Sequence, residues 1–482
     1  MLTIGEIGKL INEDINSDKK KFARKGEAYY EGDHDIKNYR LFYFNADGNL
    51  VEDKTRSNVK NAHPFFTELV DQEVQYILSG EKIAHSKDEK LQVFLDEYFN
   101  NEDFISELAE TLTGCISKGS DCMYAYRKQD GVTGFQHADS LGIVEVRKDY
   151  ADDGCEYVIY WYVDRIDKGR KKIKRIQVWD DQQTYFYVQM DGGKIAQDTS
   201  EKVNPKPHIL YTKDGDKNTY FKGFGFIPFF RLDNNKKQFS GLKTIKDLID
   251  DYDLMASSLS NNLVDFDTPI HVVKGFQGDN LDELQTNIKT KKLVGVDENG
   301  GVDVKTVDVP YLARVAKLEL DEKNIYRFGM GLNTAGLKDT AATTNIAIKA
   351  AYSLLELKCF KLEIRLKQFL RKLVSVVIDE INEKEGTAYD IKDVYFEFKH
   401  EVMSNAAENA TIKLTEAQAE QTAVNTILNL AEVLDDETIV RQICDILDIE
   451  YEEIKNNLPN PNELNDDLTD AQKVLEGVVV GE

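Results

Sequence analysis

The feature that most constrains this sequence is a helical repeat that runs from about Thr344 to Glu385. Its apolar residues recur every three or four positions: Ile348, Ala351, Leu355, Cys359, Leu362, Leu366, Phe369, Leu373 and Val376. This spacing predicts one helix with a buried face, roughly 60 Å long at 1.5 Å per residue. Because such a helix cannot lie inside one small globule, we expect it to connect two units or to pack along a neighbouring copy, which favours oligomerisation.

Residues 1–240 are expected to form a mixed α+β unit. Helical patterns cover residues 1–16, 64–80 and 91–118. From Cys122 onward the apolar period changes to two, which indicates strands. The strings MYAYR, EYVIYWYV, KRIQVWD and TYFYVQM predict one antiparallel meander, with turns at Gly131, Gly154, Gly169 and Gly192-Gly193.

The rest of the chain is expected to alternate helices with short β segments. Two helices, 242–266 and 310–329, flank a compact α/β insert that contains a turn at Asn299-Gly300-Gly301. Asp308 and Pro310 are expected to start the second of these helices, and Gly329 to close it. After the long helix, the pattern predicts a strand at 394–398 and helices at 415–434 and 437–447.

The charge of the chain limits the partners that it can bind. With 61 Lys and Arg against 86 Asp and Glu, the net charge is −25, which disfavours tight non-specific binding of DNA. Residues 405–482 are acidic by themselves. The basic run Lys168–Arg175 has two interpretations, a finger that contacts phosphates or a solvated hairpin tip, and the second is favoured.

The motifs of common enzymes are absent from the sequence. There is no GxxxxGK[ST] phosphate loop, no nucleophile elbow and no His/Cys cluster with zinc spacing. Asp250, Asp251 and Asp253 suggest a metal site, but on a helix Asp251 points about 100° away from the other two, so a solvated or intersubunit face is favoured. No apolar run is long enough to span a membrane. We therefore predict no enzymatic activity, no cofactor and no metal.

Several strings, in their order, resemble bacteriophage portal proteins, the ring subunits of the head-to-tail connector in tailed phages of the siphophage type. They are YYEGDHDI (29–36), NAHPFFTELVDQEVQYILSG (61–80), GFIPFFRLDNN (225–235) followed by KTIKDLIDDYDLMAS (243–257), and TTNIAIKAAYSLLELK (343–358). Each string alone is weak, but their succession is fairly specific over the first three quarters of the chain. The last quarter resembles the family only in being helical and acidic.

The resemblance implies an α+β portal fold with wing, stem, clip and crown. The wing would be residues 1–240, the stem helices 241–266 and 310–330, the clip 267–309, the tunnel loop 331–343, the long linking helix 344–386, and the crown with its acidic tail 387–482. The tunnel loop would place Asn333, Thr334, Leu337, Lys338, Asp339 and Thr340 in a DNA channel. Lys338 beside Asp339 suits a loop that touches a phosphate backbone without gripping it.

The resemblance also implies the partners and the location. We expect a ring of twelve copies at the capsid portal vertex, made in the host cytoplasm, with double-stranded DNA passing through it and no membrane contact. The terminase large subunit and the head-completion adaptor would dock at the clip, and major capsid and scaffolding proteins would surround the ring. Two alternatives stay open, a packaging nuclease or ATPase, and a cytosolic α+β scaffold whose long helix pairs in a dimer without a DNA role.

Overall fold

The structure is a computed structural model of the chain. It describes residues 1–451 apart from 55, 81, 129–130, 148–153, 167–171, 213–218, 267–269, 277–279, 281, 283, 285–287, 289–294, 306–309, 335–344, 401–405, 431–433 and 447–450. Two units can be distinguished: residues 1–339 together with 349–402, and residues 340–348 together with 403–482. Among the described residues, none of the helices combines the length and the apolar character that a membrane span requires.

Five helices form the N-terminal part of the first unit: α1 (Ile4–Asn16), α2 (Asp18–Tyr30), α3 (Phe65–Ile77), α4 (Glu89–Tyr98) and α5 (Glu102–Lys118). The helix α2 was not expected. The prediction of a single helix over 91–118 is wrong, because the helix is interrupted between α4 and α5. There the Asn101 side chain accepts a hydrogen bond from the Phe104 amide at 2.8 Å and starts a new helix, while Asn100 bonds the backbone of Ile83 and Ala84 instead.

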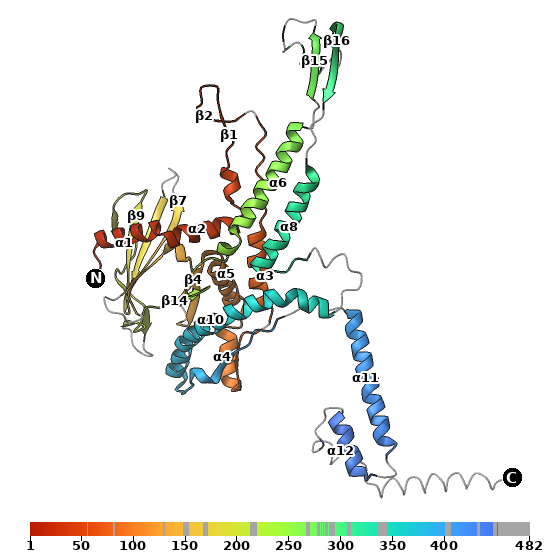
Figure 1. Cartoon of the computed structure of the whole chain (residues 1–482). Helices are drawn as coiled ribbons and strands as arrows, with labels where there is room; N and C mark the ends of the chain where they lie inside the picture. Colours follow the sequence, from red (N-terminus) through yellow and green to blue (C-terminus); the bar gives the residue numbers. More distant parts are fainter. Residues whose placement is uncertain are drawn as a thin grey trace, which may run out of the picture. The chain divides into compact units, whose positions relative to one another are not determined.

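The strands of the first unit form two main sheets. One is a meander of β6 (Ile143–Arg147), β7 (Cys155–Ile166), β8 (Lys172–Trp179), β9 (Gln183–Met190) and β10 (Ile195–Gln197), with β11 (Lys206–Pro207) added to β9. Figure 1 shows α1 lying against this sheet, where Ile7 and Ile11 join its buried core. The other sheet has the order β14-β4-β5, with bounds Phe229–Asp233, Ser120–Arg127 and Thr133–Ala138.

The strand MYAYR therefore lies outside the meander to which the sequence pattern assigned it. It forms part of β4, which pairs with β14 from about a hundred residues later in the chain, with Met123 opposite Phe230. Local periodicity cannot reveal such a long-range partner. The remaining strands form pairs: β1 (Phe42–Phe44) with β2 (Leu50–Glu52), β3 (Ala84–Ser86) with β17 (Val394–Phe396), and β12 (Ile209–Thr212) with β13 (Thr219–Lys222).

Helices α6 (Lys246–Phe266) and α8 (Tyr311–Gly329) run side by side and carry the hairpin of β15 (Ile270–Phe276) and β16 (Val296–Lys305) at their far end (Figure 1). The prediction of a turn at Asn299-Gly300-Gly301 is wrong, because these residues lie within β16. Lys274 pairs with Gly301 and Phe276 with Val296, so the extra residues form a bulge. A Cβ on Gly300 would lie 2.6 Å from the Lys274 carbonyl oxygen, which explains why a residue without a side chain occupies position 300.

Helix α10 (Asn345–Glu385) confirms the expected long helix. Its buried side is continuous from Tyr352 to Ile381, and it includes Leu355, Cys359, Leu362, Leu366, Phe369, Leu373 and Val376 from the apolar repeat. In the second unit, α11 (Ala406–Leu428) packs against α12 (Asp436–Ile446), and Ile439 and Cys444 are buried there. The mixture of helices and sheets confirms the α+β class.

Candidate functional site at the root of the loop after α8

The candidate site is the loop between α8 and α10, of which the structure describes the root. Gly331 and Leu332 are buried, Asn333 is half-buried and Thr334 is exposed. The other residues predicted to line a channel, Leu337, Lys338, Asp339 and Thr340, lie outside the described residues. Although the resemblance assigns the loop 331–343 to a channel, its first two residues, Gly331 and Leu332, are buried.

A single side chain of α3, Gln72, holds the root of the loop. Its amide oxygen accepts a hydrogen bond from the Leu332 amide at 2.9 Å, and its amide nitrogen donates to the Leu332 carbonyl oxygen, also at 2.9 Å. Both backbone groups of Leu332 are therefore paired, as they would be in a strand. The Leu332 side chain is 5% exposed, so the loop leaves the body of the protein from a fixed point.

The end of α8 is shaped by close contact with α3. A Cβ on Gly329 would lie 2.6 Å from Leu69 Cδ1, and a Cβ on Gly331 would overlap Leu69 Cδ2. Met330, with φ +55°, takes the left-handed position that was expected of Gly329. Glycine at 329 thus lets α8 approach Leu69 of α3 closely, whereas the left-handed residue that ends the helix is Met330.

Polar contacts add to this packing. The Tyr326 hydroxyl of α8 donates to Glu68 of α3 at 2.6 Å, and burial together with this carboxylate raises the pKa of Tyr326. Asn333 donates to Glu322 of α8 at 3.3 Å. The loop root is therefore bonded to the helix before it as well as to α3.

Helix α3 also holds α10, the element that follows the loop. The Glu73 carboxylate, 1% exposed, pairs with Lys358 of α10 at 2.9 Å. Tyr76 lies against the rings of Tyr352, at 5.9 Å between centroids, and His400, at 4.4 Å. Helix α3 therefore holds both Leu332, at the start of the loop, and the part of α10 around Tyr352 and Lys358.

Asp250, Asp251 and Asp253 of α6 form a junction that the sequence did not predict. Asp253 is fully buried and accepts hydrogen bonds from His34 Nδ1 at 2.6 Å, from His63 Nδ1 at 2.8 Å and from the His63 amide at 2.9 Å. Burial opposes its ionisation, but these hydrogen bonds outweigh the burial and lower the pKa of Asp253. The expectation of a solvated or intersubunit face is therefore wrong for Asp253.

The other two aspartates tie α6 to its neighbours. Asp250 accepts from the Tyr29 hydroxyl and pairs with Lys246 at 2.5 Å, and Asp251 pairs with Lys317 of α8 at 2.6 Å. The separate directions of Asp250 and Asp251 agree with the helical geometry. Within the described part of the chain, no group of three or more His, Cys, Asp or Glu side chains is arranged to hold a metal ion. The partners of Asp253 lie 219 and 190 residues away, which no local motif reveals.

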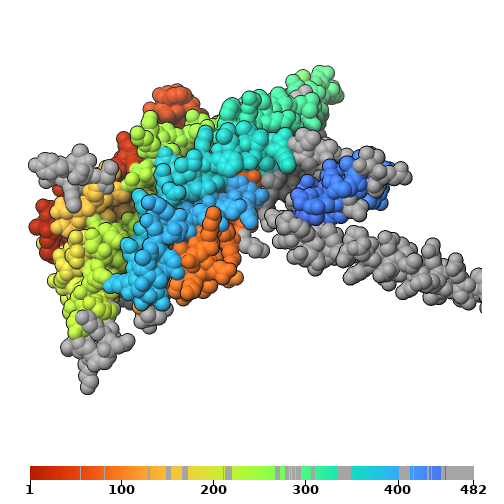
Figure 2. All heavy atoms as spheres, turned by 90° about the horizontal axis from the view of Figure 1, so that it is seen from below, coloured from red at the N-terminus to blue at the C-terminus, as the bar shows by residue number. Residues whose placement is uncertain are grey.

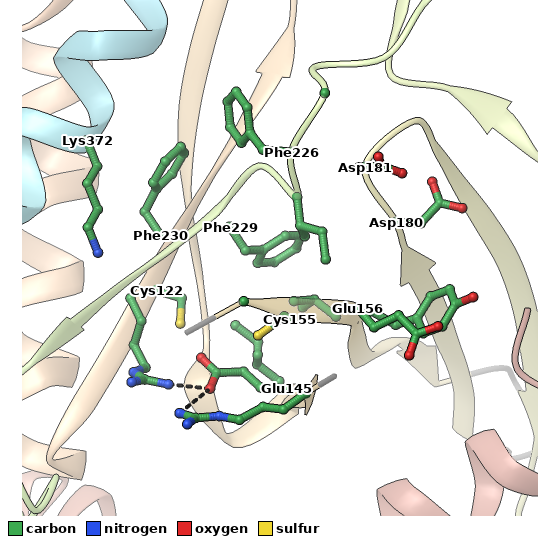
Figure 3. A pocket seen from close by; sticks show the side chains of 18 of the residues that line it. Cys122, Glu145, Cys155, Glu156, Asp180, Asp181, Phe226, Phe229, Phe230 and Lys372 are labelled. Atoms are coloured by element: carbon green, nitrogen blue, oxygen red, sulfur yellow. Dashed lines mark hydrogen bonds and ion pairs between the residues drawn. The ribbon is translucent and has the colours of Figure 1, made fainter. Parts of the chain in front are cut away.

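A cleft of about 720 Å³ lies between the two main sheets of the first unit (Figure 3). Its floor carries Cys122 and Cys155, and burial raises the pKa of both thiols, so neither is an activated nucleophile. Glu145 pairs with Arg231 and, at 4.0 Å, with Arg147. Arg231 also pairs with Asp233 at 2.7 Å, so the two arginines of the cleft are neutralised by its own carboxylates.

The part of the basic run that the structure describes, 172–175, forms the start of β8. Arg175 pairs with Asp164 at 3.0 Å and with Asp198, and the Lys174 amine lies 4.2 Å from the centre of the Trp161 ring. These contacts favour the interpretation as a solvated hairpin over that of a phosphate-contacting finger. Residues 168–171 lie outside the described part.

Comparisons with known proteins place these features in one family. The family model of phage portal proteins, SPP1 Gp6-like, matches residues 11–456. The portal protein of Bacillus phage SPP1 is 27% identical over 365 residues, which cover 75% of this chain and 70% of the relative. The portal protein of Clostridium phage phiCD119 is 23% identical over 411 residues, 80% of this chain and 84% of the relative.

Proposed function

Because the chain belongs to the SPP1 Gp6-like family of phage portal proteins and forms the portal ring at a vertex of the phage capsid, we propose that twelve copies close around a channel for double-stranded DNA. The observation that carries this proposal is the family match, which extends through almost the whole chain. DNA would enter through the ring during packaging and leave through it during ejection.

Exposed apolar side chains support assembly with neighbouring copies. They gather on three elements of the first unit: Phe42, Tyr43, Phe44, Leu50 and Val51 on the β1–β2 hairpin; Tyr311, Leu312, Leu320 and Phe328 on α8; and Leu354, Leu357, Phe360 and Ile364 on α10. Grouped exposure of this kind is typical of protein interfaces. Because the three elements differ, their contacts would be heterologous, and heterologous contacts close into a ring when the rotation between neighbouring copies permits it.

Within this ring we propose the wing at 1–240, the stem at 241–266 and 310–330, the clip at 267–309, the long linking helix at 344–386 and the crown at 387–482. The clip would receive the terminase large subunit and the head-completion adaptor. Motor activity would belong to the terminase, since this sequence has no phosphate loop. Purified rings should therefore neither hydrolyse ATP nor cut DNA, and turnover above a matched blank after a second purification step would contradict this.

We propose that the loop 331–343 faces the channel, with Asn333, Thr334, Leu337, Lys338, Asp339 and Thr340 nearest the DNA. The double anchoring on α3 supports this, because it would hold twelve loops at one level. Such a ring of loops can contact a moving duplex without binding it tightly, since each copy offers only one lysine there.

Deleting residues 334–340 tests this assignment. The deletion keeps Leu332 and its bonds to Gln72, so native mass spectrometry should still show the ring, while DNA packaging in particles should fall. A second variant replaces residues 334–340 with seven Gly and Ser residues. It keeps the length of the loop but removes its side chains, so it shows whether packaging depends on loop length or on side-chain chemistry. Loss of the ring, or packaging at the normal rate, would show that the loop does not line the channel.

A further inference from the structure

The outer edge of β14 borders the cleft between the two main sheets. In the described part of the chain, β14 has a strand neighbour on one side only, namely β4. The Ala125 amide of β4 donates to the Pro228 carbonyl oxygen at 2.8 Å, so in this antiparallel register the backbone groups of Phe229 and Arg231 point away from β4. Both residues line the cleft. Such an edge can take up an extended peptide as an added strand.

Aromatic side chains form a wall of the same cleft. Figure 3 shows Phe226, Phe229 and Phe230 grouped together there. Phe226 is 38% exposed, and its ring lies 6.1 Å from that of Phe230 between centroids. The volume of about 720 Å³ falls within the roughly 300–1,000 Å³ that is usual for ligand-binding pockets. The cleft can therefore receive the apolar side chains of a bound segment.

Three acidic side chains of the cleft have no ion pair with a described residue: Glu156, Asp180 and Asp181. Asp180 accepts hydrogen bonds from the backbone amides of Gln182 and Gln183, at 2.8 and 2.7 Å, which hold the turn between β8 and β9. The three acids act together on Tyr157, which also lines the cleft. Burial raises the pKa of Tyr157, and the charges of these acids raise it further.

Helix α10 borders the cleft on the side away from these acids. Lys372 lines the cleft, and Figure 3 shows it on the far side of the phenylalanines from the acids. Figure 2 shows the light-blue end of α10 beside the yellow-green segment of the chain, and Lys222 of that segment pairs with Glu383 of α10 at 2.9 Å. The described lining thus offers three acids without an ion pair at one end and a single lysine at the other.

We propose that this cleft binds an extended segment of a different protein, in which Lys or Arg alternates with apolar side chains. The segment would add to β14 through the Phe229 carbonyl oxygen and the Arg231 amide. Its apolar side chains would pack on the phenylalanines, and its cations would lie near the three acids. The proposal goes beyond DNA passage and does not depend on ring closure, because all the described lining residues belong to the first unit.

Charge disfavours a second copy of this chain as the occupant. With 86 Asp and Glu against 61 Lys and Arg, a copy brings more acid than base toward acids that have no cation beside them. The exposed apolar side chains that we assign to subunit contacts, on β1–β2, α8 and α10, are not among the described residues that line the cleft. A basic segment of another protein is therefore the complementary occupant.

The test uses purified full-length rings and three fluorescein-labelled peptides, AKFKFKA, AEFEFEA and AKSKSKA. The cleft variant is E156K/D181K, which keeps Asp180 and its turn. The matched control is E13K/E385K, which reverses the same amount of charge at exposed positions of α1 and α10 and so measures attraction to net charge alone. Fluorescence anisotropy at 50 mM salt gives the affinities, since exposed charges are less screened at low salt.

A second measurement locates the bound peptide. Cys155 lines the cleft and is half-buried, whereas the other four cysteines are buried. A peptide in the cleft should therefore shield Cys155 from iodoacetamide. Mass spectrometry of tryptic fragments follows this alkylation with and without peptide in the same protein, and native mass spectrometry reports whether the ring is present.

We expect AKFKFKA to bind the wild type and the control at least tenfold more tightly than either other peptide, and to slow alkylation of Cys155 at least threefold. The cleft variant should bind AKFKFKA at least tenfold more weakly than the control does, and AEFEFEA more tightly. Equal affinities of the cleft and control variants for AKFKFKA, or a wild type that shows no binding or no shielding of Cys155, would overturn the proposal.

The state of the ring separates the remaining outcomes. Loss of the ring in E156K/D181K alone would show that the cleft contacts a second copy, and this too would overturn the proposal. Absence of the ring in the wild type would contradict the portal function itself. Peptide binding and shielding of Cys155 in free chains would still support the cleft proposal, because the cleft lies within one unit of one chain.

Discussion

At the scale of single residues, the first unit depends on close approaches that only small side chains allow. Gly26 of α2 is buried against α5, where a Cβ would overlap the Ser117 carbonyl oxygen and lie 2.7 Å from Ser240 Oγ. A backbone carbonyl inside a helix cannot move aside as a flexible side chain can. The contact between α2 and α5 therefore fixes the residue at position 26.

We expect Gly26→Ala to destabilise the protein by about 1–3 kcal/mol, because α2 and α5 must separate to make room for the methyl group. Thermal unfolding followed by circular dichroism measures this as a lower Tm. Gly5→Ala is the matched control, since Gly5 lies in α1 with nothing within 4 Å of an added Cβ. It should leave Tm unchanged or raise it slightly through helix propensity. Equal effects of the two variants would contradict the packing argument.

His208 gives the protein a stability that depends on pH. Its ring stacks on Trp179, at 5.3 Å between centroids, and neither ring nitrogen has a hydrogen-bond partner in the described part of the chain. Burial lowers the pKa of His208 from 6.5 to about 4. Because the folded-state pKa is the lower one, this stability is present above pH 6.5 and is lost as the pH falls from 6.5 toward 4.

We expect His208→Phe to remove this part of the pH dependence, since Phe keeps the stacking and cannot be protonated. Between pH 7 and pH 5 the wild type should lose about 2 kcal/mol more unfolding free energy than the variant, at 1.36 kcal/mol per pKa unit. Urea unfolding at both pH values measures the difference. Parallel losses in the two proteins would show that His208 is protonated in the folded state at pH 5.

At the scale of elements, α6 and α8 are joined by a shared cation. Lys317 of α8 pairs with Asp251 of α6 at 2.6 Å and also with Asp321 one turn along α8. Asp321 is 2% exposed, so its charge depends on this partner. The two carboxylates raise the pKa of Lys317, whose amine therefore stays charged.

We expect Lys317→Met to destabilise the α6–α8 pair by about 2 kcal/mol, because it leaves the buried Asp321 carboxylate without a cation. Lys323→Met, at an exposed position of the same helix, should change little. Hydrogen exchange of α6 and α8 amides measures the local effect. The double variant Lys317→Met with Asp321→Asn should recover part of the lost protection, and failure to do so would mean that the lysine acts through packing alone.

At the scale of the whole molecule, the chain presents apolar side chains that its own described residues do not cover. On α10 alone, Leu357 is 50% exposed, Phe360 47% and Ile364 63%. Covering the exposed half of each side chain would contribute about 1 kcal/mol, so a neighbour that covers several of them is favoured. The ring is the assembly in which every copy gains this contact at once.

We expect L357E/F360E to shift native mass spectra from the ring to free chains, because a charge in each apolar contact is costly to bury. V163E/M190E is the matched control, with side chains 46% and 61% exposed on strands of the meander, and it should keep the ring. Circular dichroism should show both variants folded. Intact rings for L357E/F360E would place the subunit interface away from this side of α10.

The sequence by itself determined the elements whose pattern is local and long. The apolar repeat of α10, the amphipathic helices α6 and α8 and the strands of the meander follow from periods of 3.6 and 2, which depend only on neighbouring residues. The family resemblance was also present in ordered strings such as those at 61–80 and 343–358, and the family match confirms it.

Only the tertiary structure decided how distant segments meet. The pairing of β4 with β14, the convergence of His34 and His63 on Asp253, and the attachment of Leu332 to Gln72 join residues about 100 to 260 positions apart. Likewise, Gly329 serves packing against Leu69 rather than a left-handed turn. The reason is that a local pattern records which face of an element is buried, whereas the partner that buries it is fixed by the three-dimensional path of the chain.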